Sequence, residues 1–300
     1  MHNQHHKKDT MKPSHQRLSI NAKEYGLLRD YIQELSGISL GELKSYLVEN
    51  RLGGLVLESG CKSFGDFYLK LKHGPEAASF REKMIDLIST NETFWFRDKH
   101  PFDKLETVVL PSLYGKLRDG RSSSIDIWCA ACSTGQEPYS ISMKVIDFYK
   151  KTPTNAAYGK QVRIFATDIS STAICKAKEG LYDATAMKRG LDQHYKEAHF
   201  KEKNKLWAVS EEVKKIVTFQ TFNLKDAPPG NFGPFDVIFL RHVIIYFSDE
   251  LKKTIFDKMA RLLKPGGFLF LGNGENAAGY SNGFKKVADS DYPFYQLIMK

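Results

Sequence analysis

From about residue 120 onward, short β-rich runs alternate with helical stretches, and this alternation limits the possible folds more than any other feature of the chain. The runs lie at residues 125–129, 162–167, 216–222, 235–240 and 268–272. Strands that alternate with helices form a parallel sheet with helices packed on its faces. The sequence therefore predicts an α/β domain over residues 121–300, interrupted by a polar, lysine-rich insert at about 183–215.

The part of the chain that precedes this domain has a different pattern. Apolar residues in the region 18–90 recur with helical spacing, as between Tyr25 and Leu35, and Gly37 would end that helix. Gly53-Gly54 is expected to interrupt the next helix. The pattern predicts a small all-helical domain, joined to the sheet domain by a linker.

Residues 1–17 are polar and show no periodicity, which predicts a disordered tail. The four histidines of this tail could bind a metal, but no cysteine or acidic cluster accompanies them, so a solvated tail is the favoured interpretation.

Composition excludes several classes of protein. No run approaches the roughly 18 apolar residues of a membrane-spanning helix. Four cysteines in 300 residues are too few for a disulfide scaffold, which indicates a reducing cytoplasm. The formal net charge of +9 suggests an acidic partner, yet no basic stripe with interleaved aromatic residues predicts a nucleic-acid surface.

The loop after the first predicted strand carries the clearest sign of a ligand. Residues 129–140 read CAACSTGQEPYS and lead into a helix. Small side chains let backbone N–H groups approach a ligand, and such loops bind nucleotide-like cofactors at the carboxyl ends of parallel strands. Glu137 would repel phosphate, so the site is predicted to bind a nucleoside without phosphates.

Polar residues follow two further strands. Asp168 ends its strand where an acid commonly accepts ribose hydroxyls, with a helix N-cap as the alternative. Asn223-Leu224 could hold an adenine edge, although an asparagine in a loop more often forms a turn. Arg241-His242 ends another strand, with Tyr246 close behind; a lone histidine there is more often structural than catalytic.

The segment 91–97, NETFWFR, lies in the linker predicted over residues 91–120. Asn91, Thr93 and Arg97 alternate with apolar positions, so their polar groups could face a crevice while the aromatic rings pack inward. Ligand sites favour domain interfaces, which makes this segment a candidate cofactor contact.

Cys129 and Cys132 have the spacing of a redox or zinc motif. Zinc requires four ligands, and no second cysteine or histidine pair is suitably placed. Redox motifs of this kind open a helix, whereas Cys129 ends a predicted strand. Small buried side chains explain the pair better, and no metal site is predicted.

Together, NETFWFR, CAACSTGQEPYS, ATD, FNL and LRHVIIYF resemble the motifs of the CheR-type chemotaxis receptor methyltransferases, in order and spacing, over about residues 18–300. The resemblance implies an α/β, Rossmann-like methyltransferase domain with a small β-subdomain insert, preceded by a helical receptor-docking domain. It also implies S-adenosylmethionine as the cofactor, S-adenosylhomocysteine as its product, and methyl-ester formation on glutamates of the cytoplasmic helices of transmembrane chemoreceptors.

The resemblance also assigns roles to residues. Arg97 and Tyr246 would orient the acceptor carboxylate. Cofactor contacts would come from Asn91, Thr93, Arg97, Ala131, Glu137, Asp168, Asn223, Leu224, Leu240, Arg241 and His242. His242 stands where many relatives have asparagine. The docking helix of relatives carries several basic residues, whereas here it offers only Lys44 and Arg51, so recognition is expected to rely on the basic insert.

Two other functions compete with this interpretation. One is a catalytically degenerate module that binds S-adenosylmethionine, and the other is a nucleic-acid methyltransferase. The nearest match to the Asn/Asp-Pro-Pro-aromatic motif of DNA amino-methyltransferases is Ala227-Pro228-Pro229-Gly230, which lacks both the polar and the aromatic member. We therefore expect a cytoplasmic, monomeric enzyme that neither binds nucleic acid nor inserts into a membrane.

Overall fold

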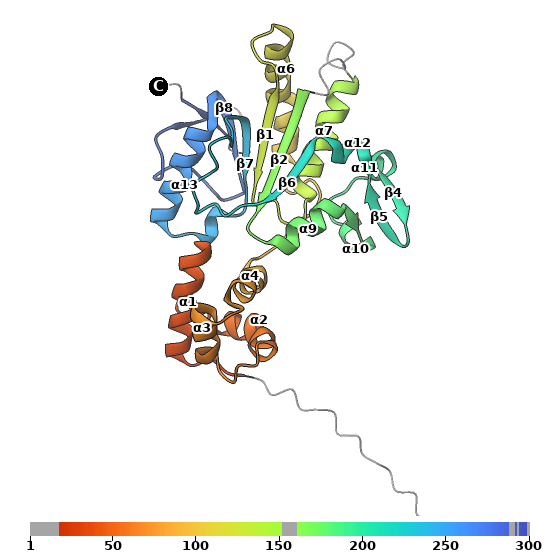
Figure 1. Cartoon of the computed structure of the whole chain (residues 1–300). Coiled ribbons are helices and arrows are strands. Elements are labelled where there is room, and N and C mark those ends of the chain that lie inside the picture. The colour runs from red at the N-terminus through yellow and green to blue at the C-terminus, as the bar shows by residue number, and fades with distance from the viewer. Residues whose placement is uncertain (1–17, 152–160, 288–291, 293, 299–300) are drawn as a thin grey trace, which may run out of the picture.

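The computed structural model describes residues 18–151, 161–287, 292 and 294–298. A group of four helices and a helix-covered sheet follow one another along the chain (Figure 1). The tail predicted over residues 1–17 lies outside the described residues. Among those residues, no helix has both the length and the apolar character needed to cross a membrane.

The N-terminal part consists of α1 (Ala22–Ser36), α2 (Ser45–Glu58), α3 (Phe64–His73) and α4 (Ala77–Ile88). Asn21 begins α1, because its side chain accepts a hydrogen bond from the Glu24 N–H and the Glu24 carboxylate accepts one from the Asn21 N–H. Gly37 ends α1 with a φ of 78°, a left-handed conformation that favours glycine. The four helices enclose an apolar core of their own, with Leu28, Val48, Phe67 and Met84 fully buried.

The expected interruption at Gly53-Gly54 is wrong, because α2 runs through both glycines without a break. A glycine inside a helix costs about 1 kcal/mol relative to alanine. Leu52, Leu55 and Val56 on either side are buried in the helical core, and burying such a side chain contributes roughly 1.5–3 kcal/mol. Packing in the tertiary structure therefore outweighs the local preference.

Residues 89–99 connect the helical part to a continuous helical stretch. This stretch comprises α5 (His100–Lys104), a π-helical turn η1 (Leu105–Val109) and α6 (Leu110–Arg118). It leads into the first strand of the sheet.

The central sheet has seven strands in the order β6-β2-β1-β7-β8-β10-β9. The first five are parallel: β6 (Val217–Thr221), β2 (Val162–Asp168), β1 (Ile125–Ala130), β7 (Phe235–Leu240) and β8 (Leu263–Leu271). They correspond to the five predicted runs. From β1 the chain moves outward to β2 and β6, then returns to the other side of β1, so the order reverses between β1 and β7. Ligands of such sheets bind at the carboxyl ends beside this reversal.

Other helices and two short strands complete this domain. They are α7 (Gln136–Lys151), α9 (Ser171–Glu179), a short 3-10 turn η3 (Ile244–Tyr246), α13 (Asp249–Leu262), β9 (Phe284–Lys286) and β10 (Phe294–Leu297). Strand β10 is antiparallel to both β8 and β9.

The insert forms a subdomain of its own beside α7 and α9 (Figure 1). It contains β3 (Leu181–Tyr182), α10 (Ala184–Met187), α11 (Gln193–His199), β4 (Phe200–Lys203), β5 (Leu206–Val209) and α12 (Glu211–Lys215). The strands form an antiparallel sheet in the order β3-β5-β4. The predicted fold class, an α/β methyltransferase-like domain with a small β-subdomain and a preceding helical domain, is confirmed.

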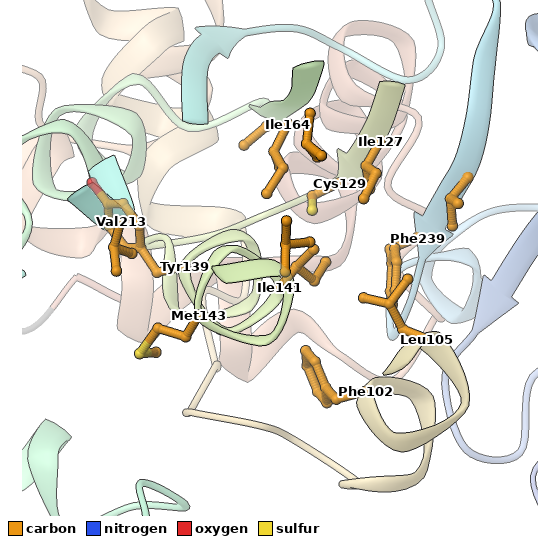
Figure 2. Close-up of a cluster of buried hydrophobic side chains, with 14 of the residues drawn as sticks. Phe102, Leu105, Ile127, Cys129, Tyr139, Ile141, Met143, Ile164, Val213 and Phe239 are labelled. Carbon is orange, nitrogen blue, oxygen red and sulfur yellow. The ribbon is translucent and has the colours of Figure 1, made fainter. Parts of the chain in front are cut away.

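Alternate residues of the central strands face two separate apolar cores. On one face, side chains of β1, β2 and β7 meet those of α5, η1, α7 and α12, and Cys129 lies among them (Figure 2). On the other face, Trp128 and Ile238 pack in a core shared with Phe256 and Met259 of α13. Because the central sheet is buried on both faces, the sequences of its strands are nearly continuous apolar runs.

Candidate active site

A cavity that opens to solvent lies between the helical domain and the carboxyl ends of β1, β2, β6 and β7. One wall comes from the end of α1, the start of α2 and residues 88–97. All the predicted site residues line the cavity except Leu240, which is fully buried in the core at the end of β7. The Leu240 side chain points to the side of the strand opposite to Arg241, because successive side chains of a strand point to opposite faces.

The loop after β1 adopts a conformation that requires small residues. Ala131 and Ser133 have φ values of 65° and 50°, and Gly135 has 94°. A Cβ on Gly135 would lie 2.9 Å from the Cβ of Ala177, so glycine is needed there for close packing against α9. The Ser133 hydroxyl donates to the Asn91 carbonyl over 3.0 Å, which ties this loop to the linker.

Asp168 is a buried carboxylate held by backbone groups. One oxygen accepts from the Ser133 N–H at 2.7 Å and the other from the Ser170 N–H at 2.9 Å. Burial raises the pKa of Asp168, and these N–H donors oppose that rise. Ser170, and not Asp168, is the N-cap of α9. Each Asp168 oxygen retains a lone pair, so the carboxylate can still accept hydrogen bonds from a ligand in the cavity.

The NETFWFR segment divides its side chains between cavity and core. Asn91, Thr93 and Arg97 line the cavity, whereas Trp95 and Phe96 are buried. The Arg97 guanidinium donates to the Glu92 carbonyl at 2.9 Å and lies 5.4 Å from the centre of the Phe94 ring. Within the described ranges, no carboxylate forms an ion pair with Arg97.

Arg241 is the centre of an ionic network that the sequence did not predict. Its side chain is 1% exposed and pairs with Glu137 at 2.6 Å and with Asp98 at 2.8 Å. It also donates to the Arg97 carbonyl at 2.6 Å. The Nε2 atom of His242 lies 2.7 Å from the same Asp98 oxygen.

The pKa values of the two acids in this network are shifted in opposite directions. Burial alone would raise the pKa of Asp98, but the hydrogen bonds and charges of His242 and Arg241 outweigh it and lower the pKa to about 2. Glu137 is more deeply buried, and burial raises its pKa despite the nearby charge of Arg241.

The loop after β7 joins the sheet domain to the helical domain. His242 has a left-handed φ of 56°, a conformation that asparagine, aspartate and histidine adopt more readily than other side chains do. Tyr246 follows in η3, and its carbonyl accepts from the Ser39 N–H at 2.8 Å. Beside it, Ile38 and Phe247 form an isolated antiparallel bridge.

The loop after β6 is also attached to the helical domain. The Asn223 side-chain amide donates to the Leu35 carbonyl at 2.9 Å, and its oxygen accepts from the Lys225 N–H at 3.0 Å, as in a turn-forming asparagine. Buried Lys258 donates to the carbonyls of Leu224 and Asp226, each at 2.5 Å. Burial lowers the pKa of this lysine.

Comparison with protein families matches both parts of the chain. The CheR methyltransferase all-alpha domain matches residues 23–89, and the CheR methyltransferase SAM-binding domain matches residues 91–292. The chain belongs to the CheR methyltransferase family.

Named relatives cover nearly the whole chain. The chemotaxis protein methyltransferase Cher2 of Pseudomonas putida is 38% identical over 280 residues, which is 93% of this chain and 99% of the relative. Chemotaxis protein methyltransferase 1 of Pseudomonas aeruginosa is 40% identical over 259 residues, 86% of this chain and 92% of the relative. The chemotaxis protein methyltransferase of Borreliella burgdorferi is 33% identical over 266 residues, 88% of this chain and 92% of that protein.

The chemistry of the cavity fits S-adenosylmethionine, the methyl donor of the CheR family. This cofactor carries ribose hydroxyls, an ammonium group and a sulfonium, and it has no phosphate. Two buried carboxylates, Glu137 and Asp168, line the cavity. They would repel a phosphate and suit hydroxyl or cationic groups.

Cys129 and Cys132 are both buried and unpaired, and burial raises their pKa values well above the ordinary range. Such thiols pack as small apolar groups. No group of three or more potential metal ligands occurs in the described part of the chain.

Sequence reasoning missed three charged residues that support the CheR site from behind the cavity lining: Asp98, Lys258 and Glu275. Each is held by partners more than 30 positions away in the chain, and Glu275 accepts in addition from the nearby Gly272 N–H. Asp98 follows Arg97 directly, which was the one local signal available.

Proposed function

We propose that the protein transfers the methyl group of S-adenosylmethionine to glutamate side chains on the cytoplasmic helices of chemoreceptors, forming methyl esters in the cytoplasm. The observation that carries this proposal is the Arg97 guanidinium, which has no carboxylate partner among the described residues and lies in a cavity that also contains Asp168. A cation without a carboxylate partner, beside a cofactor site, suits an acceptor that is itself a carboxylate. The names of the relatives support a role in chemotaxis.

The cofactor supplies an activated methyl group, so the protein has to position the acceptor. A glutamate is ionised at pH 7, because its reference pKa is about 4.3, and no general base is needed. Arg97 would hold the acceptor carboxylate without neutralising it fully, and Tyr246 would contribute its hydroxyl from the loop after β7. Correct alignment of reacting groups supplies much of the rate enhancement in such transfers.

The cofactor contacts are proposed as follows. Asp168 would accept from the ribose hydroxyls, and the loop after β1 would approach the cofactor through Ala131 and its backbone. The remaining contacts would come from Asn91, Thr93, Arg97, Glu137, Asn223, Leu224, Arg241 and His242, all of which line the cavity. Leu240 lies outside this set.

Receptor recognition is proposed to involve the insert as well as the helical domain. Arg51 of α2 donates to the Ile88 carbonyl at 2.5 Å at the end of α4 and lines the cavity. In the insert, exposed lysines face solvent: Lys188, Lys201, Lys203 and Lys205. These positive charges would attract acidic receptor helices to a monomeric enzyme.

Incubation with labelled S-adenosylmethionine and receptor-containing membranes tests the proposal. Label that appears on the receptor and is released by base indicates a methyl ester and supports it. Cofactor binding without transfer would instead identify a degenerate binding module. Base-stable label in added nucleic acid would identify a nucleic-acid methyltransferase.

A further inference from the structure

The two loops that follow β6 and β7 are each held by one buried charged side chain from a later part of the chain. Lys258 of α13 holds the loop after β6 through two backbone carbonyls. Glu275, which lies after β8 and is 5% exposed, holds the loop after β7 through backbone N–H groups. The first loop carries Asn223 and the second carries Tyr246, so the two side chains support different parts of the cavity.

The Glu275 carboxylate accepts four backbone hydrogen bonds. Its Oε2 atom accepts from the N–H groups of Gly272 at 2.6 Å and His242 at 2.8 Å. Its Oε1 atom accepts from Val243 at 3.0 Å and Ile244 at 3.1 Å. In the regions that the structure describes, no cation forms an ion pair with Glu275. The backbone of the loop therefore supplies its hydrogen-bond partners.

Little free space surrounds this carboxylate. A Cβ on Gly272 would lie 2.6 Å from Glu275 Oε2 and 2.7 Å from the His242 nitrogen. Glycine at that position leaves room for the carboxylate to reach the loop.

These bonds stabilise a conformation that the loop would not favour alone. His242 is left-handed, and three successive N–H groups from His242 to Ile244 converge on one carboxylate. Successive amides arranged in this way form a concave anion site, which Glu275 fills from within the protein. The bonds thus fix the backbone between Arg241, which is bound to Glu137, and Tyr246, which faces the cavity.

We infer that Glu275 is a positioning residue for methyl transfer, setting the backbone of the loop that presents Tyr246 to the acceptor. This inference rests on the proposed function, because it assigns the loop after β7 to the acceptor side. It requires a carboxylate: a glutamine would keep one acceptor oxygen and turn an NH2 group toward two N–H donors, leaving both unpaired.

The test compares Glu275→Gln with two other full-length variants. In Glu275→Gln, kcat on receptor membranes is expected to fall about 10- to 100-fold, the size of effect that small misplacements produce. The Kd for S-adenosylhomocysteine, measured by calorimetry, should change less than about threefold, since most of the proposed cofactor contacts, Asp168 and the loop after β6 among them, lie outside the loop after β7. Glu179→Gln, an exposed glutamate on α9, should match the wild type in both.

Lys258→Met should affect cofactor affinity more than turnover, the reverse of Glu275→Gln. It leaves the carbonyls of Leu224 and Asp226 without their donor on the cofactor side of the cavity. Its Kd for S-adenosylhomocysteine should rise more than its kcat falls. Equal kcat in Glu275→Gln and the wild type would overturn the inference, as would parallel losses of kcat and cofactor affinity in that variant.

Two further measurements keep the test decisive. If Glu275→Gln does not fold, Glu275→Asp retains the charge with a shorter reach; reduced kcat with unchanged cofactor affinity supports the inference, and wild-type kcat overturns it. Failure of the proposed function would show differently, as wild-type protein that binds the cofactor but places no base-labile label on the receptor.

Discussion

Arg97 and Arg241 line the same cavity, yet their surroundings differ. The guanidinium of Arg241 is buried and bound to Glu137, Asp98 and the backbone carbonyl of Arg97. The guanidinium of Arg97 is partly exposed and donates to the Glu92 carbonyl, beside the Phe94 ring. One arginine is therefore ion-paired within the protein, and the other can still bind a carboxylate that enters the cavity.

The difference shows that two arginines of one cavity can have different main roles. Removing a buried, paired charge leaves its partners uncompensated, so its effect is expected mainly in stability. Removing a cation without a carboxylate partner is expected mainly to affect substrate positioning. Substitutions at the cavity can separate these two roles.

Arg241→Met should have the largest effect. It leaves Glu137 and Asp98 without their cation, which typically costs about 3–5 kcal/mol in the free energy of unfolding. Urea denaturation measures this loss. The control is Arg121→Met, because Arg121 pairs with Asp119 on the surface and should change stability by at most about 1 kcal/mol. Equal losses in the two variants would contradict the assignment of Arg241 as a buried support.

Arg97→Ala should lower kcat by about 100-fold through loss of acceptor alignment, with a smaller change in cofactor affinity. Arg189→Ala is a matched control, since Arg189 lies 5.1 Å from the same Phe94 ring but does not line the cavity. Its kcat at saturating receptor should stay near that of the wild type. Unchanged turnover in Arg97→Ala would refute the placement of this residue at the acceptor.

Asp168→Ala tests the part of the cavity that neither arginine contacts. The Kd for S-adenosylmethionine should rise by a factor equivalent to about 1–3 kcal/mol, if two hydroxyl hydrogen bonds are lost. Calorimetry measures this change, with exposed Asp257→Ala as the control. Unaltered binding would show that the ribose is held elsewhere.

Asp98→Asn should have the smallest effect on stability, and this effect should depend on pH in the acid range. The pKa of Asp98 is lowered from 3.8 to about 2, so its contribution to stability is present above about pH 4 and is lost as the pH falls toward 2. The difference between wild type and variant should be roughly 1 kcal/mol after solvent screening and should shrink across that window. Denaturation at several pH values measures it. A difference in the free energy of unfolding that does not change with pH would argue that Asp98 acts through packing and not through its charge. Glu137 is present in both proteins, so its ionisation does not distinguish them.

Much of the fold could be predicted because buried parallel strands leave a strong local signal. The five apolar runs correspond to β1, β2, β6, β7 and β8. Strands β9 and β10 were missed because they are short, and β9 lies at the edge of the sheet. The break expected in α2 at Gly53-Gly54 was wrong. The helix continues because neighbouring side chains are buried in a core that distant residues complete.

The site was predictable as a set of positions but not as a set of contacts. Loops at the carboxyl ends of parallel strands must converge, which brought Glu137, Asp168 and Tyr246 to one cavity. By contrast, Asp98 and Glu275 look like ordinary solvated acids in the sequence. Their roles depend on which atoms the completed fold encloses with them, and spacing along the chain does not encode that.

The attachment of Ile38 and Ser39 to Phe247 and Tyr246 has a consequence for how relatives can be recombined. In a chimera that joins residues 18–90 of one parent to the remainder of another, the two segments of this attachment would come from different proteins. The loop that presents Tyr246 would then rest on a foreign surface. A chimera that is to keep this attachment therefore has to take the segment after α1 and the sheet domain from the same parent.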